Sequence, residues 1–244
     1  MNLKKGLLIG TVVIAFLASC KKETIPNDDI ELGKEYFPIT KDHTIEYAID
    51  SIIYNDFNKS TDTFSMQFKD VIGESFYDNE GRESYVVNRF RRQDDTYTWE
   101  DMMTFYATKT NFRVEVVENN LRMIKLVFPV KLKTAWAGNI YIPAQIDDDL
   151  KWLWNWNYSY TSINQPFNTG KASFSNALVV VGINDSINNP EQFPNSIANK
   201  RYSKEVYAKN VGLIYRELTN WDYQPDGSRY RNGFTTIYRA IRSY

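Results

Sequence analysis

Apolar and polar side chains alternate along most of the chain beyond residue 34. The alternation is clearest over residues 45–50, 64–69 and 112–116, and it returns near the C-terminus. A period of two places one set of side chains on each face of an extended segment, so these stretches predict half-buried β-strands. Apolar residues spaced by three and four positions are scarce, and only short helices are expected, at 147–153 or 190–197.

Turn residues separate the predicted strands. Residues 78–81 (Asp-Asn-Glu-Gly) and 118–120 (Glu-Asn-Asn) favour turns and lie between alternating stretches. We therefore predict an all-β fold of antiparallel sheets that form a half-barrel or a sandwich, with at most short helices. A chain of this length can form one such domain, which we assign to residues 34–244; an alternative divides it near 130–136.

Aromatic side chains gather in one segment of this pattern. They recur at every second position: Trp152, Trp154, Trp156, Tyr158 and Tyr160. In an extended segment all five would project to one face, where they could face a ligand such as a sugar ring, a lipid chain or a partner protein. The same alternation marks the core face of a buried strand, which is the interpretation that we favour. A short helix beginning near Asp147 would break the strip by turning Trp152 elsewhere.

The first twenty residues have the pattern of an export signal. Two lysines at positions 4 and 5 precede an apolar run over 6–17, which is shorter than the roughly 20 residues that span a bilayer. The run ends in Leu-Ala-Ser-Cys at 17–20, which resembles the lipobox of bacterial lipoproteins. The resemblance implies that residues 1–19 are a cleaved signal peptide and that Cys20 carries lipid. The polar residues 20–33 are expected to form a tether.

Three motifs of the C-terminal half resemble a series of uncharacterised lipoproteins from Bacteroidota. They are Trp136-Ala137-Gly138-Asn139, Tyr158-Ser159-Tyr160 and the stretch 207–217, Tyr-Ala-Lys-Asn-Val-Gly-Leu-Ile-Tyr-Arg-Glu. Those lipoproteins usually have Gly where this chain has Asn210, and Asn tolerates the left-handed backbone region that a turn can require. The resemblance implies an all-β protein of the cell envelope and supplies no activity.

The residues after Cys20 bear on localisation. In lipoproteins of that phylum, an acidic cluster close to the lipidated cysteine accompanies export to the cell surface. Here Lys21 and Lys22 come first, and only Glu23 is acidic nearby. We therefore expect a protein held to the outer membrane by the lipid on Cys20 and facing the periplasm, with surface exposure as the alternative.

Composition argues against several kinds of chemistry. Cys20 is the only cysteine and His43 the only histidine, so metal centres and catalytic sites built from several such residues are not expected. The 29 basic and 30 acidic side chains nearly balance, which does not favour nucleic acid as a partner. The acidic run 147–149 is interpreted as a turn or the start of a short helix. We predict no cofactor, no metal and no catalytic residues.

Three functions follow from these observations. The first is a non-catalytic envelope lipoprotein that binds a partner protein or an envelope component. The second is a carrier or sensor of a small hydrophobic or glycan ligand held in a half-barrel, and the third, ranked last, is a hydrolase. A cavity lined by the aromatic segment would favour the second function, and a filled interior with an exposed patch the first. Two close buried carboxylates in an open cleft would favour the third.

Overall fold

The computed structural model describes residues 32–244, which form one compact unit. The predicted signal peptide, Cys20 and all but the end of the predicted tether lie outside these residues. The described part consists of strands and two short 3-10 segments: η2 (Lys34–Tyr36), β1 (Thr44–Asn55), β2 (Ser60–Tyr77), β3 (Glu83–Arg92), β4 (Glu100–Lys109), β5 (Arg113–Glu118), β6 (Leu121–Val127), β7 (Ala135–Trp136), η3 (Asp148–Leu153), β8 (Tyr158–Asn168), β9 (Ser173–Ile187), β10 (Ala198–Ala208), β11 (Gly212–Tyr223) and β12 (Arg231–Ser243).

One antiparallel sheet contains all twelve strands of the described part. Its order is β6-β5-β4-β3-β2-β1-β12-β11-β10-β9-β8-β7, so strands that follow one another in the chain pair as hairpins. There are two exceptions: β6 and β7 are consecutive but do not pair, and β1 pairs with β12 in the middle of the sheet, where Ile49 lies opposite Tyr238. This pairing joins the two ends of the domain and leaves β6 and β7 as the edges of the sheet.

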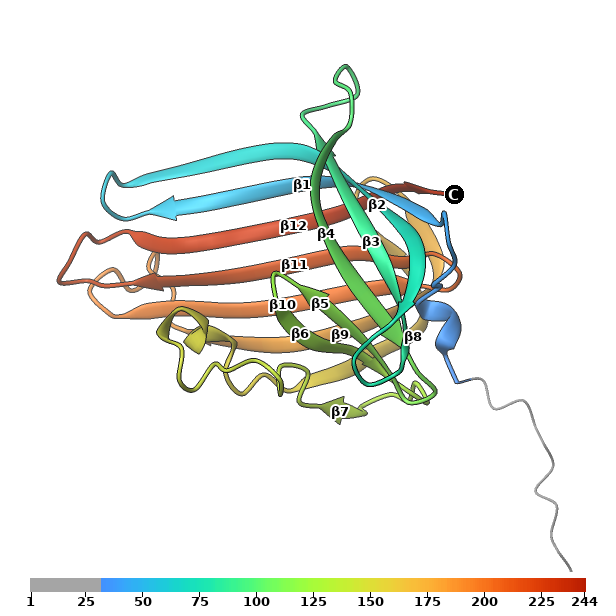
Figure 1. Cartoon of the computed structure of the whole chain (residues 1–244). Coiled ribbons are helices and arrows are strands. Elements are labelled where there is room, and N and C mark those ends of the chain that lie inside the picture. Colours follow the sequence, from blue (N-terminus) through green and yellow to red (C-terminus); the bar gives the residue numbers. More distant parts are fainter. Residues whose placement is uncertain (1–31) are drawn as a thin grey trace, which may run out of the picture. The chain divides into compact units, whose positions relative to one another are not determined.

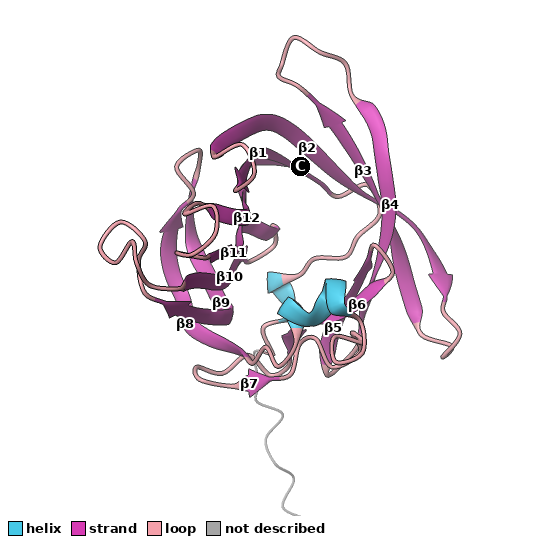
Figure 2. Ribbon diagram, turned by 90° about the vertical axis from the view of Figure 1, so that its left-hand side faces the viewer, coloured by secondary structure: helices cyan, strands magenta, loops and turns pink. Residues whose placement is uncertain are grey.

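The sheet curls until it is nearly closed into a barrel. In Figure 1 most strands run across the view and β3–β6, drawn in green, cross them at a steep angle; in Figure 2 the sheet surrounds an interior. Twist accumulates over many strands, and register shifts such as the one between Glu46 and Tyr47 add local bends. The predicted all-β half-barrel with only short helices is confirmed, and a single sheet forms it.

The alternation along β5 shows how the sequence period sets the inner and outer faces. Val114 and Val116 are buried in the core, and Glu118 follows on the same face and lines the interior. Arg113 and Glu115 project from the opposite face because successive side chains of a strand point to opposite sides. Each strand therefore contributes residues to two different environments.

Polar contacts join the two edges of the sheet where the barrel nearly closes. The Ile124 amide donates to the Gly138 carbonyl at 2.8 Å, and the Trp136 indole donates to the Ile124 carbonyl at 2.9 Å. The Tyr160 hydroxyl donates to the Val127 carbonyl and accepts from the Val127 amide, at 2.6 and 2.8 Å. The Trp-x-Gly-Asn motif and the last Tyr of the Tyr-Ser-Tyr motif thus hold β6 against β7 and β8.

Gly138 and Asn139 fix the position of Tyr158 behind this seam. A Cβ atom at position 138 would lie 2.3 Å from the Tyr158 ring, so only glycine allows the close approach. The Tyr158 hydroxyl donates to the Asn139 side chain at 3.0 Å, and the Asn139 amide donates to the Leu153 carbonyl at the same distance. The motifs at 136–139 and 158–160 therefore pack on one another.

The turn between β10 and β11 follows the sequence prediction. Asn210 has φ of 61°, in the left-handed region, and Gly212 follows with φ of 97°. The turn therefore tolerates Asn at the position where the similar lipoproteins have Gly.

Two local expectations need correction. The aromatic segment 152–160 is not one continuous strand, because η3 occupies its beginning and β8 starts only at Tyr158. Asp147 causes this break, since its side chain accepts from the Asp149 amide and caps η3. The segment 190–197 forms turns instead of a helix.

Candidate functional site

Charged side chains from both halves of the sheet meet in the interior. They come from β2, β3, β5, β6, β10 and β11. The side chains from β3, β6 and β10 are almost fully buried, and those from β2, β5 and β11 are slightly more exposed. We call this group the interior ion network: Asp70, Arg89, Glu118, Lys125, Glu205 and Arg216. Three acids and three bases balance in charge, as buried ions must to offset their loss of hydration.

Arg89 connects the first half of the network. Its guanidinium binds both oxygens of Asp70 at 2.7 Å, a bidentate geometry, and its Nη1 lies 2.5 Å from Glu118. The guanidinium also lies over the rings of Phe68 and Phe105, at 5.4 and 4.8 Å from their centroids. Arg89 is thereby held rigidly between strands that follow one another in the sheet.

Glu205 connects the second half. It accepts from Lys125 Nζ at 2.7 Å, from Arg216 Nε at 3.0 Å and from the Tyr207 hydroxyl at 2.6 Å. Arg216 also lies 3.6 Å from Glu118, which links the two halves. The contacts form one chain that runs across the interior from β2 to β6.

Burial and neighbouring charges shift the pKa values of these groups. Burial raises the pKa of Glu205, but the charges of Lys125 and Arg216 lower it more, and the result is a pKa of about 2. The pKa of Glu118 is lowered in the same way by Arg89 and Arg216 against the effect of burial. Burial lowers the pKa of Lys125 although Glu205 opposes the shift. Both carboxyl groups are therefore ionised at neutral pH.

The network separates two cavities. A cavity of about 80 Å³ lies toward η2 and is lined by Phe37, His43 and Leu213; we call it the η2-side cavity. A cavity of about 200 Å³, the η3-side cavity, lies toward η3, which Figure 1 shows in yellow at the opposite end of the barrel. Glu118, Lys125 and Arg216 line both, so the ions form a common wall.

The predicted aromatic residues take different positions around the η3-side cavity. Trp152, Trp156 and Tyr158 line it, and the Trp152 and Trp156 rings meet edge to face at 5.6 Å. Trp156 is 4% exposed, whereas Trp154 is 55% exposed and points away from the cavity toward the surface. Tyr160 is buried at the seam. The structure therefore brings three of the five residues to one cavity and separates the other two.

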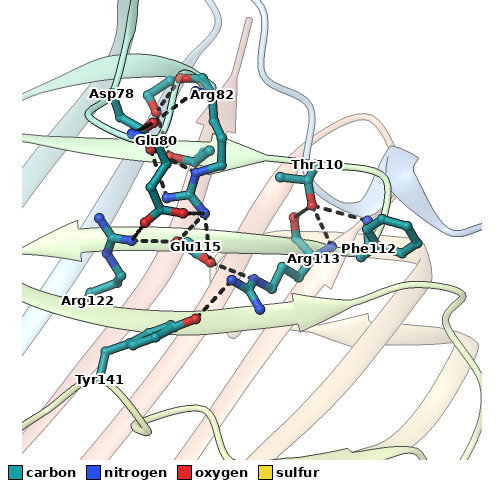
Figure 3. Close-up of polar contacts among 11 residues, drawn as sticks. Asp78, Glu80, Arg82, Thr110, Phe112, Arg113, Glu115, Arg122 and Tyr141 are labelled. Atoms are coloured by element: carbon teal, nitrogen blue, oxygen red, sulfur yellow. Dashed lines mark hydrogen bonds and ion pairs between the residues drawn. The ribbon is translucent and has the colours of Figure 1, made fainter.

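A second cluster of charges lies on the outer face of β5 and β6 and in the turn between β2 and β3 (Figure 3). We call it the outer ion cluster: Asp78, Glu80, Arg82, Arg113, Glu115 and Arg122. Glu115 is almost fully buried at its centre, with Arg82, Arg113 and Arg122 at 3.1, 2.5 and 3.4 Å. The Tyr141 hydroxyl accepts from Arg113 at 2.9 Å.

The segment that precedes β8 forms a surface groove of about 420 Å³. Ile140, Ile146 and Trp154 line it and are exposed. Exposed apolar side chains in a group are typical of contact surfaces.

The interior ion network was not predicted from the sequence. From the sequence, Glu118 is expected in a turn and Arg216 lies in the motif at 207–217, and no role is expected for the other four residues. One available signal was Lys125, whose neighbours two positions away, Met123 and Val127, are both apolar. A charge in this position lies on a core-facing row of a strand.

Within residues 32–244, no group of three or more His, Cys, Asp or Glu side chains is arranged to hold a metal ion. The same residues contain no helix that is long and apolar enough to span a membrane.

The fold and site define a single-sheet antiparallel half-barrel with a charged, partly hollow interior. No protein-family model matches the chain, and none of the curated proteins is significantly similar to it. Among solved structures, the chain is similar to a protein of Bacteroides fragilis that is regarded as exported and has a YmcC-like fold. The two share 11% identity over 85% of this chain and 98% of that chain, with a TM-score of 0.42. At this level the similarity says nothing of function.

Proposed function

We propose that this protein is a non-catalytic lipoprotein of the cell envelope whose half-barrel binds a small ligand in the η3-side cavity. The observation that carries the proposal is the cavity itself, which combines rings of Trp152 and Trp156 with charged groups of the interior ion network. Ligand sites typically combine an apolar wall with a few polar groups that orient the ligand.

The size of the cavity sets the size of the ligand. At roughly 10–15 Å³ for each water-sized occupant, a volume of about 200 Å³ suits a ligand of about ten to twenty non-hydrogen atoms. A short amphiphile meets this limit, and a folded peptide or a whole phospholipid exceeds it.

The carboxyl groups of the cavity wall support binding over hydrolysis. A glycoside hydrolase needs one protonated carboxyl group near neutral pH as its general acid. The pKa values of Glu118 and Glu205 are both shifted downward, which is the opposite of what a general acid requires. We therefore assign these residues to the binding wall.

Binding is tested by filling the cavity. The purified protein is titrated with octanol by calorimetry, and Leu218→Trp, which adds bulk to the cavity wall, should abolish the binding heat. Leu132→Trp, at an exposed position outside the cavity, is the matched control and should bind as the wild type does. Equal binding by Leu218→Trp, or no binding by the wild type, contradicts the proposal.

The envelope location rests on the lipobox at the start of the chain. We expect Cys20→Ser to leave the protein unlipidated and released from membranes, because several acyl chains together are needed for firm anchoring. Labelling of cells with an acyl-chain analogue measures this directly. Incorporation of label into the Cys20→Ser variant would refute the assignment.

A second candidate function is the binding of an envelope protein. The surface groove with exposed Ile140, Ile146 and Trp154 favours it. A photo-crosslinking residue at position 146 should then yield one discrete adduct in cells, while the same residue at the exposed Phe57 should not. Identical adduct patterns at both positions would exclude a specific surface.

A further inference from the structure

We infer that the η3-side cavity selects a small organic anion, with the anionic group at Lys125 and Arg216 and the apolar body against the tryptophans. This inference rests on the proposed function and specifies the chemistry of its ligand. It follows from a comparison of the hydrogen-bond donors and acceptors that line the cavity.

Lys125 has more hydrogen-bond donors than the acceptors around it can use. Its side chain is 5% exposed and lines both cavities, and an ammonium group carries three N–H donors. Among residues 32–244, Glu205 Oε1 is the only acceptor within hydrogen-bond distance of Lys125 Nζ. Two donors of this nearly buried cation therefore have no acceptor among the described residues, and the side chain borders the cavity.

Arg216 adds further donors to the same wall. Within the described part of the chain, its one hydrogen bond runs from Nε to Glu205, and its Nη1 contacts Glu118 only at 3.6 Å. A guanidinium carries five N–H donors in a planar fork that matches the oxygens of a carboxylate. Lys125 and Arg216 share Glu205 Oε1 as a partner and line the same cavity, so their cationic groups lie side by side in its wall.

Three of the four carboxylate oxygens of the wall already accept hydrogen bonds, and the fourth, Glu118 Oε2, has Arg216 at 3.6 Å. Glu205 Oε1 accepts from Lys125 and Arg216, and Oε2 accepts from Tyr207. Glu118 Oε1 accepts from Arg89 at 2.5 Å. A cationic ligand would have to displace these donors, whereas an anion would satisfy donors that remain, through charge-assisted hydrogen bonds.

An apolar wall faces the charged one. It consists of Leu121, Met123, Trp152, Trp156 and Leu218. This surface can bury a short hydrocarbon chain or a ring while the anionic group stays at the ions, so the cavity matches a small amphiphilic acid.

The test compares two ligands that differ in the head group. Octanoate and octanol are titrated into the purified wild-type protein, into Lys125→Met and into Lys204→Met. Lys204 lies one residue before Glu205, packs on the rings of Phe167 and Tyr215, and lines neither cavity, so it provides the matched control. The comparison of the two ligands on wild-type protein stays decisive if Lys125→Met fails to fold.

We expect the wild type to bind octanoate roughly tenfold more tightly than octanol, which corresponds to one charge-assisted interaction. Lys125→Met should lose this preference and keep its octanol affinity, and Lys204→Met should retain the preference. Equal affinity of the wild type for both ligands, or an unchanged preference in Lys125→Met, overturns the inference while the proposed binding function stands. Binding of neither ligand overturns both.

Discussion

The interior ion network and the outer ion cluster have the same composition and different surroundings. Each contains three acids and three bases, and in each an almost fully buried glutamate, Glu205 or Glu115, is the common acceptor of its neighbours. The arginines around Glu115 are partly exposed and close over it. The cations around Glu205 instead line open cavities.

Under the proposed function, this difference separates a structural role from a binding role. The outer ion cluster ties the β2–β3 turn to β5 and β6 (Figure 3), and none of its residues lines either cavity. The interior ion network ties six strands together, and its Lys125 and Arg216 border a cavity. The number of charged residues alone therefore does not distinguish the two sites. The cavity beside the interior ion network does.

The largest effect should come from removal of the interior acceptor. Glu205→Ala leaves Lys125 and Arg216 buried without their shared carboxylate, and we expect a loss of about 3–5 kcal/mol in the free energy of unfolding. Glu80→Ala in the outer ion cluster, where the side chain is largely exposed, should cost less than about 1 kcal/mol. Denaturant unfolding measures both. Similar losses for the two variants would remove the distinction between the sites.

Removal of a buried tryptophan from the wall of the η3-side cavity should lower the free energy of unfolding by a similar amount. Trp156→Ala removes a buried ring and should cost about 3–5 kcal/mol, while Trp154→Ala at the surface should change stability by less than about 0.5 kcal/mol. Trp152, which is partly buried, should fall between them. Thermal melts of the three variants decide the order, and equal melting temperatures would contradict the positions of these rings.

The next-largest effect should come from low pH, which should reduce the stability that the interior ion network provides. The pKa of Glu205 is lowered on folding from an ordinary 4.5 to about 2, so its stabilisation is present above pH 4.5 and is lost as pH falls toward 2. The shift corresponds to about 3 kcal/mol. Glu205→Gln should therefore flatten the acid limb of a plot of unfolding free energy against pH. An acid limb as steep as that of the wild type would show that Glu205 does not titrate as described.

The smallest effect is expected from a substitution at the centre of the outer ion cluster. Glu115→Gln keeps the shape of the side chain but weakens three arginine contacts, and we expect a loss of about 1–3 kcal/mol. Octanoate affinity should not change, because Glu115 lines neither cavity. Reduced octanoate binding in a folded Glu115→Gln protein would mean that the outer ion cluster influences the cavity.

The fold was predictable where one period governed a whole strand. The alternation predicted the inner and outer faces of β5 over 113–116, although Phe112 lies in the preceding turn and is exposed, and Asn210 was expected in a turn that it does form. In the aromatic segment the stated alternative holds: the short helix expected near Asp147 forms as η3, and this local cap overrides the period of two that follows it.

The candidate site was less predictable because its partners are far apart in the chain. Lys125 and Glu205 are separated by 80 residues, and Arg89 and Glu118 by 29. Each alone reads as an ordinary charge on a strand or turn. Only the curl of the sheet brings them together, and the cavities depend on that curl and on the volumes of side chains from many strands.

The central claim is that the η3-side cavity holds a small anionic amphiphile. A crystal structure of the protein with bound 8-bromooctanoate tests it most directly, because the bromine can be located by its anomalous scattering. We predict bromine beside Trp152 and Trp156 with the carboxylate within hydrogen-bond distance of Lys125 or Arg216. Bromine only in the surface groove beside Ile146, or an empty interior at saturating ligand, would contradict the claim.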